Sequence, residues 1–294
     1  MAYGSPQSLD EVEAYYTHIR GGRKPTSEQL AELVGRYRAI GGSSPLLQIT
    51  RRQATGLRRL LSAEGSTTRV YAAMKHSPPF IPDVMREVKS DGVNELLCIV
   101  LAPHYSSMSI GGYMKAVDDA LGDNGNFARV DFVMSWHTNP RLISAWSSMI
   151  GKAEERIGND NWLIFTAHSL PERILAMGDP YKDQLLETAS SIARKLGTGN
   201  WSYAFQSASM TGEPWLGPDI LEHLEYLKNN NKRKFLIAPI GFVSDHLEIL
   251  YDIDVETMSW ARSNEVMVAR CDSFNASDDL IHCLSSVAQE RGFL

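Results

Sequence analysis

Cysteine is scarce in this sequence, and its few positions exclude one class of fold. Only Cys98, Cys271 and Cys283 occur among the 294 residues. They include no C-x-x-C pair and no even set at the spacing of a disulfide framework. This excludes a disulfide-stabilised scaffold and argues against an all-cysteine metal cluster. We expect an ordinary hydrophobic core instead, and a composition that is 43% hydrophobic is sufficient to build one.

Long hydrophobic runs are also missing. The longest ones, such as Leu96 to Ala102, are far shorter than the ~20 residues that a membrane helix needs. No charged leader precedes an apolar stretch at the N-terminus. We therefore expect a cytoplasmic protein that is a freely soluble monomer, with no stable membrane insertion.

The sequence has no excess of positive charge. Its formal net charge is -6, and no basic stripe runs along it. Proteins that bind nucleic acids usually carry a basic excess, so we expect no nucleic-acid partner. The motifs G-x-G-x-x-G, G-x-x-x-x-G-K-[ST] and G-x-S-x-G are absent as well, which leaves no signature of a nucleotide site or of a hydrolase elbow.

Apolar β-rich runs alternate with longer helical patterns, which is typical of α/β proteins whose parallel sheets are flanked by helices. The pattern predicts strands at 69–73, 95–102, 130–134, 162–167, 201–205, 235–240 and 265–269. It predicts helices near 8–20, 27–39, 46–62, 80–90, 109–121, 139–157, 181–196, 217–229, 245–262 and 276–291. Capping boxes of the form S-x-x-E are predicted at Ser8 with Glu11 and at Ser169 with Glu172.

We expect two apposed halves, 1–138 and 139–294, because a helix follows the strand that ends near Ser135. Ligands of open parallel sheets bind beyond the carboxyl ends of the strands, so residues just after strands are the first candidates for a site.

His168 is one such residue, because it directly follows the predicted strand 162–167. An isolated histidine in a helix-entry loop more often packs or caps than binds a ligand, so His168 alone decides little. Its ordinary pKa of about 6.5 predicts a neutral imidazole near pH 7, able to take a proton or to bind a metal.

A row of acidic residues follows the predicted strand 235–240. Glu248, Asp252 and Glu256 recur at four-residue steps and share one helix face, where each like-charge pair costs roughly 0.2–0.5 kcal/mol. Asp245 with Glu248 also fits a capping box, but that explanation does not extend to Glu256. The row therefore favours a path for a cation. An imidazole and a carboxylate converging on one metal suit several divalent ions, and ligand type alone does not select among them.

Seven longer segments of the sequence match one known family. They are MAYGSP at 1–6, YYTHIRGGRKP at 15–25, AIGGSSPLLQIT at 39–50, VLAPHYSS at 100–107, FTAHSLPERI at 165–174, EPWLGPD at 213–219 and PIGFVSDHLEILYDIDVE at 239–256. The likeness spans nearly the whole chain, and the segments AHSLPE and GFVSDHLEILYD are highly specific. On these segments the chain resembles the ferrochelatases, particularly the soluble type of Gram-positive bacteria.

The resemblance implies two Rossmann-like halves with a porphyrin cleft between them, and insertion of Fe(II) into a porphyrin in haem biosynthesis. Coproporphyrin III is favoured over protoporphyrin IX as the substrate. Fe(II) is then a substrate, and neither an organic cofactor nor an iron–sulfur cluster is expected.

The same resemblance implies roles for individual residues. His168 and Glu248 match the family's metal-site pair, and Asp252 and Glu256 match its acidic ridge for hydrated metal. The residues that match porphyrin-binding positions are Tyr3, as a weakly coordinating tyrosine, Arg20, Ser44 and Tyr113, beside anionic groups of the ligand, and Trp215 and His76, with less defined roles.

Three questions stay open at this level. Either His168 or Glu248 could accept the pyrrole proton while the other binds metal. A related chelatase acting on cobalt or nickel and a reduced tetrapyrrole would tolerate the same pair. A non-catalytic porphyrin or haem carrier would keep a cleft but would not need the row from Glu248 to Glu256.

Overall fold

The computed structural model describes residues 1–122, 127–209 and 212–294. Its chain forms two compact units. The first contains Met1–Trp136, Ser244–His246 and Asn275–Leu294, and the second contains His137–Val243 and Leu247–Phe274. Asn275–Leu294 at the end of the chain therefore belongs to the first unit, whereas the division expected after residue 138 placed it in the second half. The reason is packing: α11 (Asp278–Glu290) lies against α3 (Leu46–Ala63).

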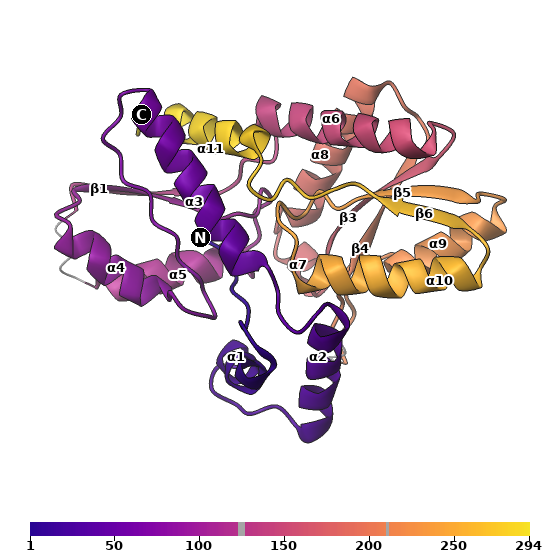
Figure 1. Ribbon diagram of the computed structural model, residues 1–294, viewed down its shortest axis with the longest axis horizontal. Helices are drawn as coiled ribbons and strands as arrows, with labels where there is room; N and C mark the ends of the chain where they lie inside the picture. The colour runs from indigo at the N-terminus through magenta and orange to yellow at the C-terminus, as the bar shows by residue number, and fades with distance from the viewer. Residues whose placement is uncertain (123–126, 210–211) are drawn as a thin grey trace. The chain divides into compact units, whose positions relative to one another are not determined.

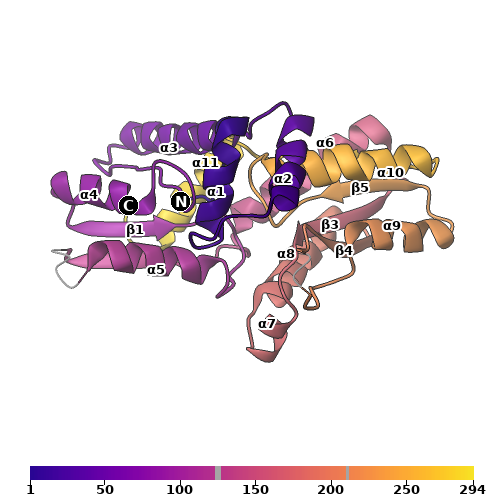
Figure 2. The same ribbon diagram turned by 90° about the horizontal axis from the view of Figure 1, so that it is seen from below.

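The first unit is built around a parallel pair of strands, β1 (Glu95–Ile99) and β2 (Arg129–Val133). Helices α3 and α5 lie on opposite sides of β1 (Figures 1 and 2). Buried side chains of α4 and α5 form one core with Cys98 and Val100. The other elements are η1 (Leu9–Glu11), α1 (Val12–Ile19), α2 (Ser27–Ala39), α4 (Ile81–Ser90) and α5 (Ile110–Leu121).

The strand predicted at 69–73 does not form. Its residues belong to no strand or helix, and the bridges nearby are isolated ones from Met74 to Ala2 and to Phe80. A strand needs a continuous ladder with a neighbour, whereas residues 73–76 bond to the start of the chain and Met74 also bonds to Pro79 and Ile81.

The second unit contains a four-stranded parallel sheet in the order β4-β3-β5-β6. The strands are β3 (Trp162–His168), β4 (Trp201–Gln206), β5 (Lys234–Ala238) and β6 (Met267–Arg270). Helices cover both faces, so β3 and β5 are buried over almost their whole length and read as continuous apolar runs. The helices are α6 (Pro140–Ile157), α7 (Arg173–Ala176), α8 (Tyr181–Leu196), α9 (Ile220–Asn229), a π-helix η2 (Glu248–Thr257) and α10 (Met258–Ser263).

The predicted fold class is confirmed, since both sheets are parallel and flanked by helices. The predicted capping boxes are wrong. Ser8 makes no side-chain cap, and the Ser169 hydroxyl donates to the carbonyl of Leu216 instead. A complete capping box occurs at Thr26 with Gln29, at the start of α2. Within the described ranges, every helix is too short or too polar to cross a membrane.

Candidate functional site

His168 and Glu248 meet in the second unit. His168 is the last residue of β3, and Glu248 is the first residue of η2, in the chain that follows β5. The imidazole Nε2 lies 3.5 Å from the Glu248 Oε1, and both side chains are about one-third exposed, at 31% and 28%. The pair therefore lies beyond the carboxyl ends of neighbouring parallel strands and is open to a ligand.

Gly241 allows this approach. Its amide donates to the carbonyl of Thr166 on β3 at 3.1 Å. A Cβ at position 241 would lie 2.5 Å from the Cβ of Ala167, the residue before His168. Glycine is thus required for the chain after β5 to pass directly against the end of β3.

The surroundings of His168 fix its orientation and its charge. Its Nδ1 faces the carbonyl oxygen of Ser169, which leaves Nε2 directed at Glu248. Burial, the largest influence, lowers the imidazole pKa, but the charge and hydrogen bond of Glu248, the Ser169 carbonyl and Asp252 together raise it to about 9. His168 is therefore an imidazolium at pH 7, and the expectation of a neutral ring was wrong because it took no account of the carboxylates.

The acidic row lies on a π-helix, where the sequence predicted an ordinary α-helix over 245–262. The Thr257 hydroxyl donates to the carbonyl of Asp252 at 2.7 Å, five residues back. Asp252 is buried at 3% exposure and accepts a hydrogen bond from the Ser207 hydroxyl. Glu256 is exposed. The row thus extends from an exposed carboxylate to a buried one and then to the His168–Glu248 pair.

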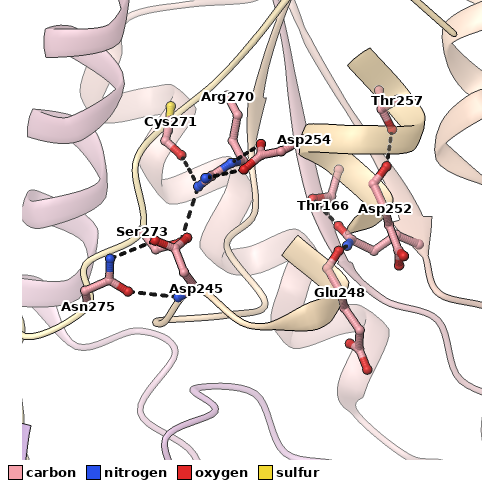
Figure 3. A network of polar contacts seen from close by, with 11 residues as sticks. Thr166, Asp245, Glu248, Asp252, Asp254, Thr257, Arg270, Cys271, Ser273 and Asn275 are labelled. Atoms are coloured by element: carbon pink, nitrogen blue, oxygen red, sulfur yellow. Dashed lines mark hydrogen bonds and ion pairs between the residues drawn. The ribbon is translucent and has the colours of Figure 1, made fainter. Parts of the chain in front are cut away.

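Asp254, in the same helix, points away from this row (Figure 3). It forms a two-pronged ion pair with Arg270, with both N–O distances at 2.8 Å. The Arg270 side chain is 13% exposed and that of Asp254 is 33% exposed, so the pair is partly shielded from water. The guanidinium of Arg270 neutralises the charge of Asp254, and Asp254 is therefore a structural residue of η2.

Gln206 is a site residue that the sequence analysis missed. It ends β4, is 1% exposed, and its Nε2 donates to the carbonyl of Glu248 at 2.8 Å. Its Oε1 accepts from the Thr166 hydroxyl at 3.0 Å. A polar residue at the end of an otherwise apolar strand was the available signal. Gln206 connects β3 to the first turn of η2 and so positions Glu248.

Two aromatic residues complete the surroundings of His168. The Tyr181 hydroxyl donates to the His168 carbonyl at 2.9 Å, and burial of the ring raises the pKa of Tyr181 well above its usual value. The ring centroid of Trp215 lies 6.4 Å from that of His168, at a tilt of 45°. Trp215 is held there by an antiparallel bridge to Pro171. The structure thus places the predicted Trp215 beside the pair.

In the first unit, Tyr3 and His76 form an aromatic cluster with His18. Tyr3 is 42% exposed, and its ring centroid lies 4.5 Å from that of His76. The Nδ1 atoms of His18 and His76 are 3.0 Å apart. Burial, then Lys75, then His18 lower the pKa of His76 to about 4. His76 is therefore neutral at physiological pH.

The other residues predicted to bind the porphyrin also belong to this unit. Tyr113 is buried on α5, with the Lys75 ammonium 5.1 Å from its ring centroid. The buried Ser44 accepts from the amide of Leu46, where α3 begins. Arg20 follows α1, and its Nε atom is buried without a hydrogen-bond partner among the residues that the structure describes. A buried guanidinium nitrogen in this state is suited to an anionic ligand.

The four predicted metal residues do not form one cluster. Across the described ranges, no group of three or more His, Cys, Asp or Glu side chains could hold an ion together. His168 and Glu248 form a pair, and Asp252 and Glu256 follow along η2. The three cysteines are all buried, and burial raises the pKa of both Cys98 and Cys271 to about 12.

Solved structures with a similar fold are chelatases. The chain matches the structure titled "SirB from Bacillus subtilis with Fe3+" with a TM-score of 0.60 at 11% identity, over 83% of this chain and 89% of that one. It matches CbiX, titled the terminal enzyme for siroheme biosynthesis in denitrifying bacteria, with a TM-score of 0.55 at 12% identity, over 98% and 96% of the two chains. At this identity the likeness concerns the fold alone.

Sequence relatives give a closer result. The chain is 42% identical to the ferrochelatase of Herpetosiphon aurantiacus, over 98% of this chain and 96% of the relative. It is 40% identical to coproporphyrin III ferrochelatase 2 of Bacillus cereus, over 99% and 92%. The ferrochelatase family model matches residues 1–292. The chain belongs to the ferrochelatase family, whose enzymes insert a metal ion into a porphyrin.

Proposed function

We propose that this chain inserts Fe(II) into coproporphyrin III in haem biosynthesis. Membership of the family supports metal insertion, and the Bacillus cereus relative named for coproporphyrin III supports that substrate. The observation that carries the proposal is the His168–Glu248 pair, 3.5 Å apart beyond the ends of neighbouring strands. The rest of the site is consistent with such a reaction.

Metal insertion must remove two pyrrole protons and the water bound to the ion. His168 carries a proton at pH 7 because its pKa is raised to about 9. We propose that Fe(II), arriving beside Glu248, displaces this proton to water and leaves a neutral imidazole, since metal binding requires deprotonated ligands. One member of the pair then holds the ion, and the other accepts the two pyrrole protons in turn and passes each of them to water.

The acidic row supplies the metal in this proposal. Glu256 is exposed, Asp252 is buried, and Glu248 contacts the imidazole. Carboxylate oxygens suit a hydrated divalent ion and hold it weakly, so the ion can be passed inward. A carrier that only binds porphyrin would have no use for such a row.

We propose that the predicted porphyrin residues bind the substrate through polar donors and aromatic rings. Arg20 offers its buried Nε to a propionate group, and the hydroxyls of Ser44 and Tyr113 add neutral donors. Tyr3 and Trp215 offer aromatic surface to the flat ring. The cleft between two halves stays a prediction, as do a cytoplasmic location, a monomeric state and the lack of an iron–sulfur cluster.

The test is an anaerobic insertion assay followed by the Soret absorption. Fe(II) is offered with coproporphyrin III and with protoporphyrin IX, at equal concentrations. We expect turnover with the first to exceed turnover with the second. The His168→Ala variant should lose turnover, while His282→Ala, an exposed histidine of α11, should keep it. Absence of turnover with both porphyrins would overturn the proposal.

Metal competition separates the related activities. If Co(II) or Ni(II) with a reduced tetrapyrrole reacts faster than Fe(II) with coproporphyrin III, the chain is a different chelatase. If coproporphyrin III binds tightly while no metal is inserted, the chain is a carrier. Either result would contradict the assignment to iron insertion.

A further inference from the structure

Two histidine side chains of the first unit share one hydrogen bond. His18 lies on α1 and His76 lies just after the isolated bridges at Met74, and their Nδ1 atoms are 3.0 Å apart. The two rings meet edge to face, with an interplanar angle of 75°. Two N–H groups, or two bare nitrogens, would repel each other at this distance. One Nδ1 atom of the pair therefore carries a hydrogen and donates it to the other.

His76 is fixed by the start of the chain. Its amide donates to the Tyr3 carbonyl at 2.8 Å, and the Lys75 amide donates to the Ala2 carbonyl at 2.9 Å. The Tyr3 ring lies against the imidazole, with the ring centroids 4.5 Å apart. Its Nδ1 is bonded to His18, whereas its Nε2 has no hydrogen-bond partner among the residues that the structure describes. That nitrogen is therefore available to a ligand.

The surroundings of the two rings decide which of them donates. His18 is exposed to water and stacks on Phe80, with the ring centroids 5.1 Å apart and an interplanar angle of 27°. An aromatic face attracts positive charge placed over it, so His18 accommodates an additional hydrogen. His76 is less exposed, and positive charge would lose more hydration there. The hydrogen between the two Nδ1 atoms therefore belongs to His18.

This direction determines the chemistry of the second His76 nitrogen. A neutral imidazole has hydrogen on one nitrogen only, so an Nδ1 that accepts from His18 leaves the hydrogen of His76 on Nε2. A nitrogen that carries a hydrogen has no lone pair with which to bind Fe(II) or to take a pyrrole proton. It is a hydrogen-bond donor.

We propose that His18 is a positioning residue for His76: it donates from Nδ1 to the His76 Nδ1 and so makes the His76 Nε2 a donor toward the porphyrin. The last step rests on the proposed function, in which Tyr3 offers its ring to the porphyrin and His76 lies against Tyr3. His76 then binds an acceptor atom of the porphyrin. The metal and proton steps belong to His168 and Glu248.

Nitrogen-15 NMR of the full chain, without substrate, tests the direction of the bond. Labelled histidine is used, and the two ring signals of His76 are identified by their loss in His76→Gln. A ring nitrogen that carries a hydrogen resonates far from one that does not, so the two signals report the tautomer. We expect hydrogen on Nε2 and none on Nδ1. Hydrogen on Nδ1 and a bare Nε2 would overturn the proposal.

A matched pair of variants tests the role of His18. His18→Asn retains an N–H donor close to the position of Nδ1, whereas His18→Asp offers an acceptor in a side chain of the same shape. Both changes are at an exposed position, so we expect both variants to fold. The Asn variant should keep the wild-type signals, and the Asp variant should place a hydrogen on the His76 Nδ1. A bare Nδ1 in the Asp variant would refute the positioning role.

Insertion assays at pH 8 test the consequence for the porphyrin. In His18→Asp the KM for coproporphyrin III should rise about threefold to tenfold, as expected for the loss of one neutral hydrogen bond, with the KM for Fe(II) unchanged. His18→Asn should behave as the wild type, as should His282→Ala at an exposed position. Equal KM values for porphyrin in the Asp and Asn variants would overturn the contact with porphyrin. If the wild type inserts no metal, the proposed function fails, and the NMR comparison still decides the tautomer.

Discussion

The side chain of Gln206 holds the backbone of Glu248, because its Nε2 donates to the Glu248 carbonyl at 2.8 Å while its Oε1 accepts from Thr166. This arrangement ties the first turn of a π-helix to the ends of two strands. The Glu248 carboxylate, which holds the metal in our proposal, is therefore oriented by a buried amide that contacts neither substrate in that proposal.

Replacing Gln206 should show this positioning role. In Gln206→Ala both buried hydrogen bonds are lost, which costs about 1–3 kcal/mol of unfolding free energy. We expect kcat to fall and the KM for porphyrin to stay the same. Denaturant unfolding and steady-state insertion assays measure the two effects. The control is Gln289→Ala, an exposed residue of α11, and a Gln206→Ala variant with normal kcat would refute the role.

The raised pKa of His168 predicts how stability depends on pH. Protonated His168 stabilises the folded state because its folded pKa is about 9 and its ordinary value is 6.5. That contribution is complete below pH 6.5 and is lost as the pH rises through 9. The unfolding free energy of the wild type should therefore decline over this range relative to His168→Ala. Urea unfolding at pH 6 and pH 9.5 measures it, with His282→Ala expected to follow the wild type.

The ion pair of Asp254 with Arg270 should matter for stability alone. Arg270→Leu leaves the Asp254 carboxylate partly buried without its partner, which should cost about 3 kcal/mol. The exposed pair of Lys115 with Asp119 is the comparison, since breaking a surface pair costs about 1 kcal/mol or less. Denaturant titration of Arg270→Leu and Lys115→Leu distinguishes them. Equal losses would show that the Arg270 pair is no stronger than a surface contact.

Substitutions at Glu256 and Asp252 should distinguish an effect on Fe(II) kinetics from an effect on folding stability. Glu256→Gln removes an exposed charge, so we expect a higher KM for Fe(II), an unchanged KM for porphyrin and unchanged stability. Asp252→Asn should alter Fe(II) kinetics and also lower stability, because Asp252 is buried and bonded to Ser207. The control is Glu222→Gln, exposed on α9. An unaltered KM for Fe(II) in Glu256→Gln would exclude Glu256 from the metal path.

Arg20 should act on porphyrin alone. Arg20→Met removes the buried Nε donor, and we expect the KM for coproporphyrin III to rise several-fold, with the KM for Fe(II) unchanged. Arg23→Met, at an exposed position nearby, should behave as the wild type. Porphyrin fluorescence quenching measures binding directly. Identical affinities of the two variants would mean that Arg20 does not contact the ligand.

The sequence by itself determined the fold class and the candidate residues. Apolar runs such as 162–167 and 235–240 became buried strands because helices cover both of their faces, and that burial leaves a local pattern. The residues after those strands, His168 and the segment beginning at Gly241, carry the specific motifs. The segment 69–73 has the local pattern of a strand but does not form one, because strand pairing depends on a neighbour that is distant in the sequence.

Only the tertiary structure decided how these residues act. It brought the His168 ring to Glu248, gave η2 its π form, and raised the histidine pKa through the charge of carboxylates on another element. It also assigned α11 to the first unit by packing it on α3. Each of these outcomes depends on packing contacts and electrostatic interactions between residues that are far apart in the sequence. Such interactions depend on distances in the folded structure, and the spacing of residues along the chain does not give those distances.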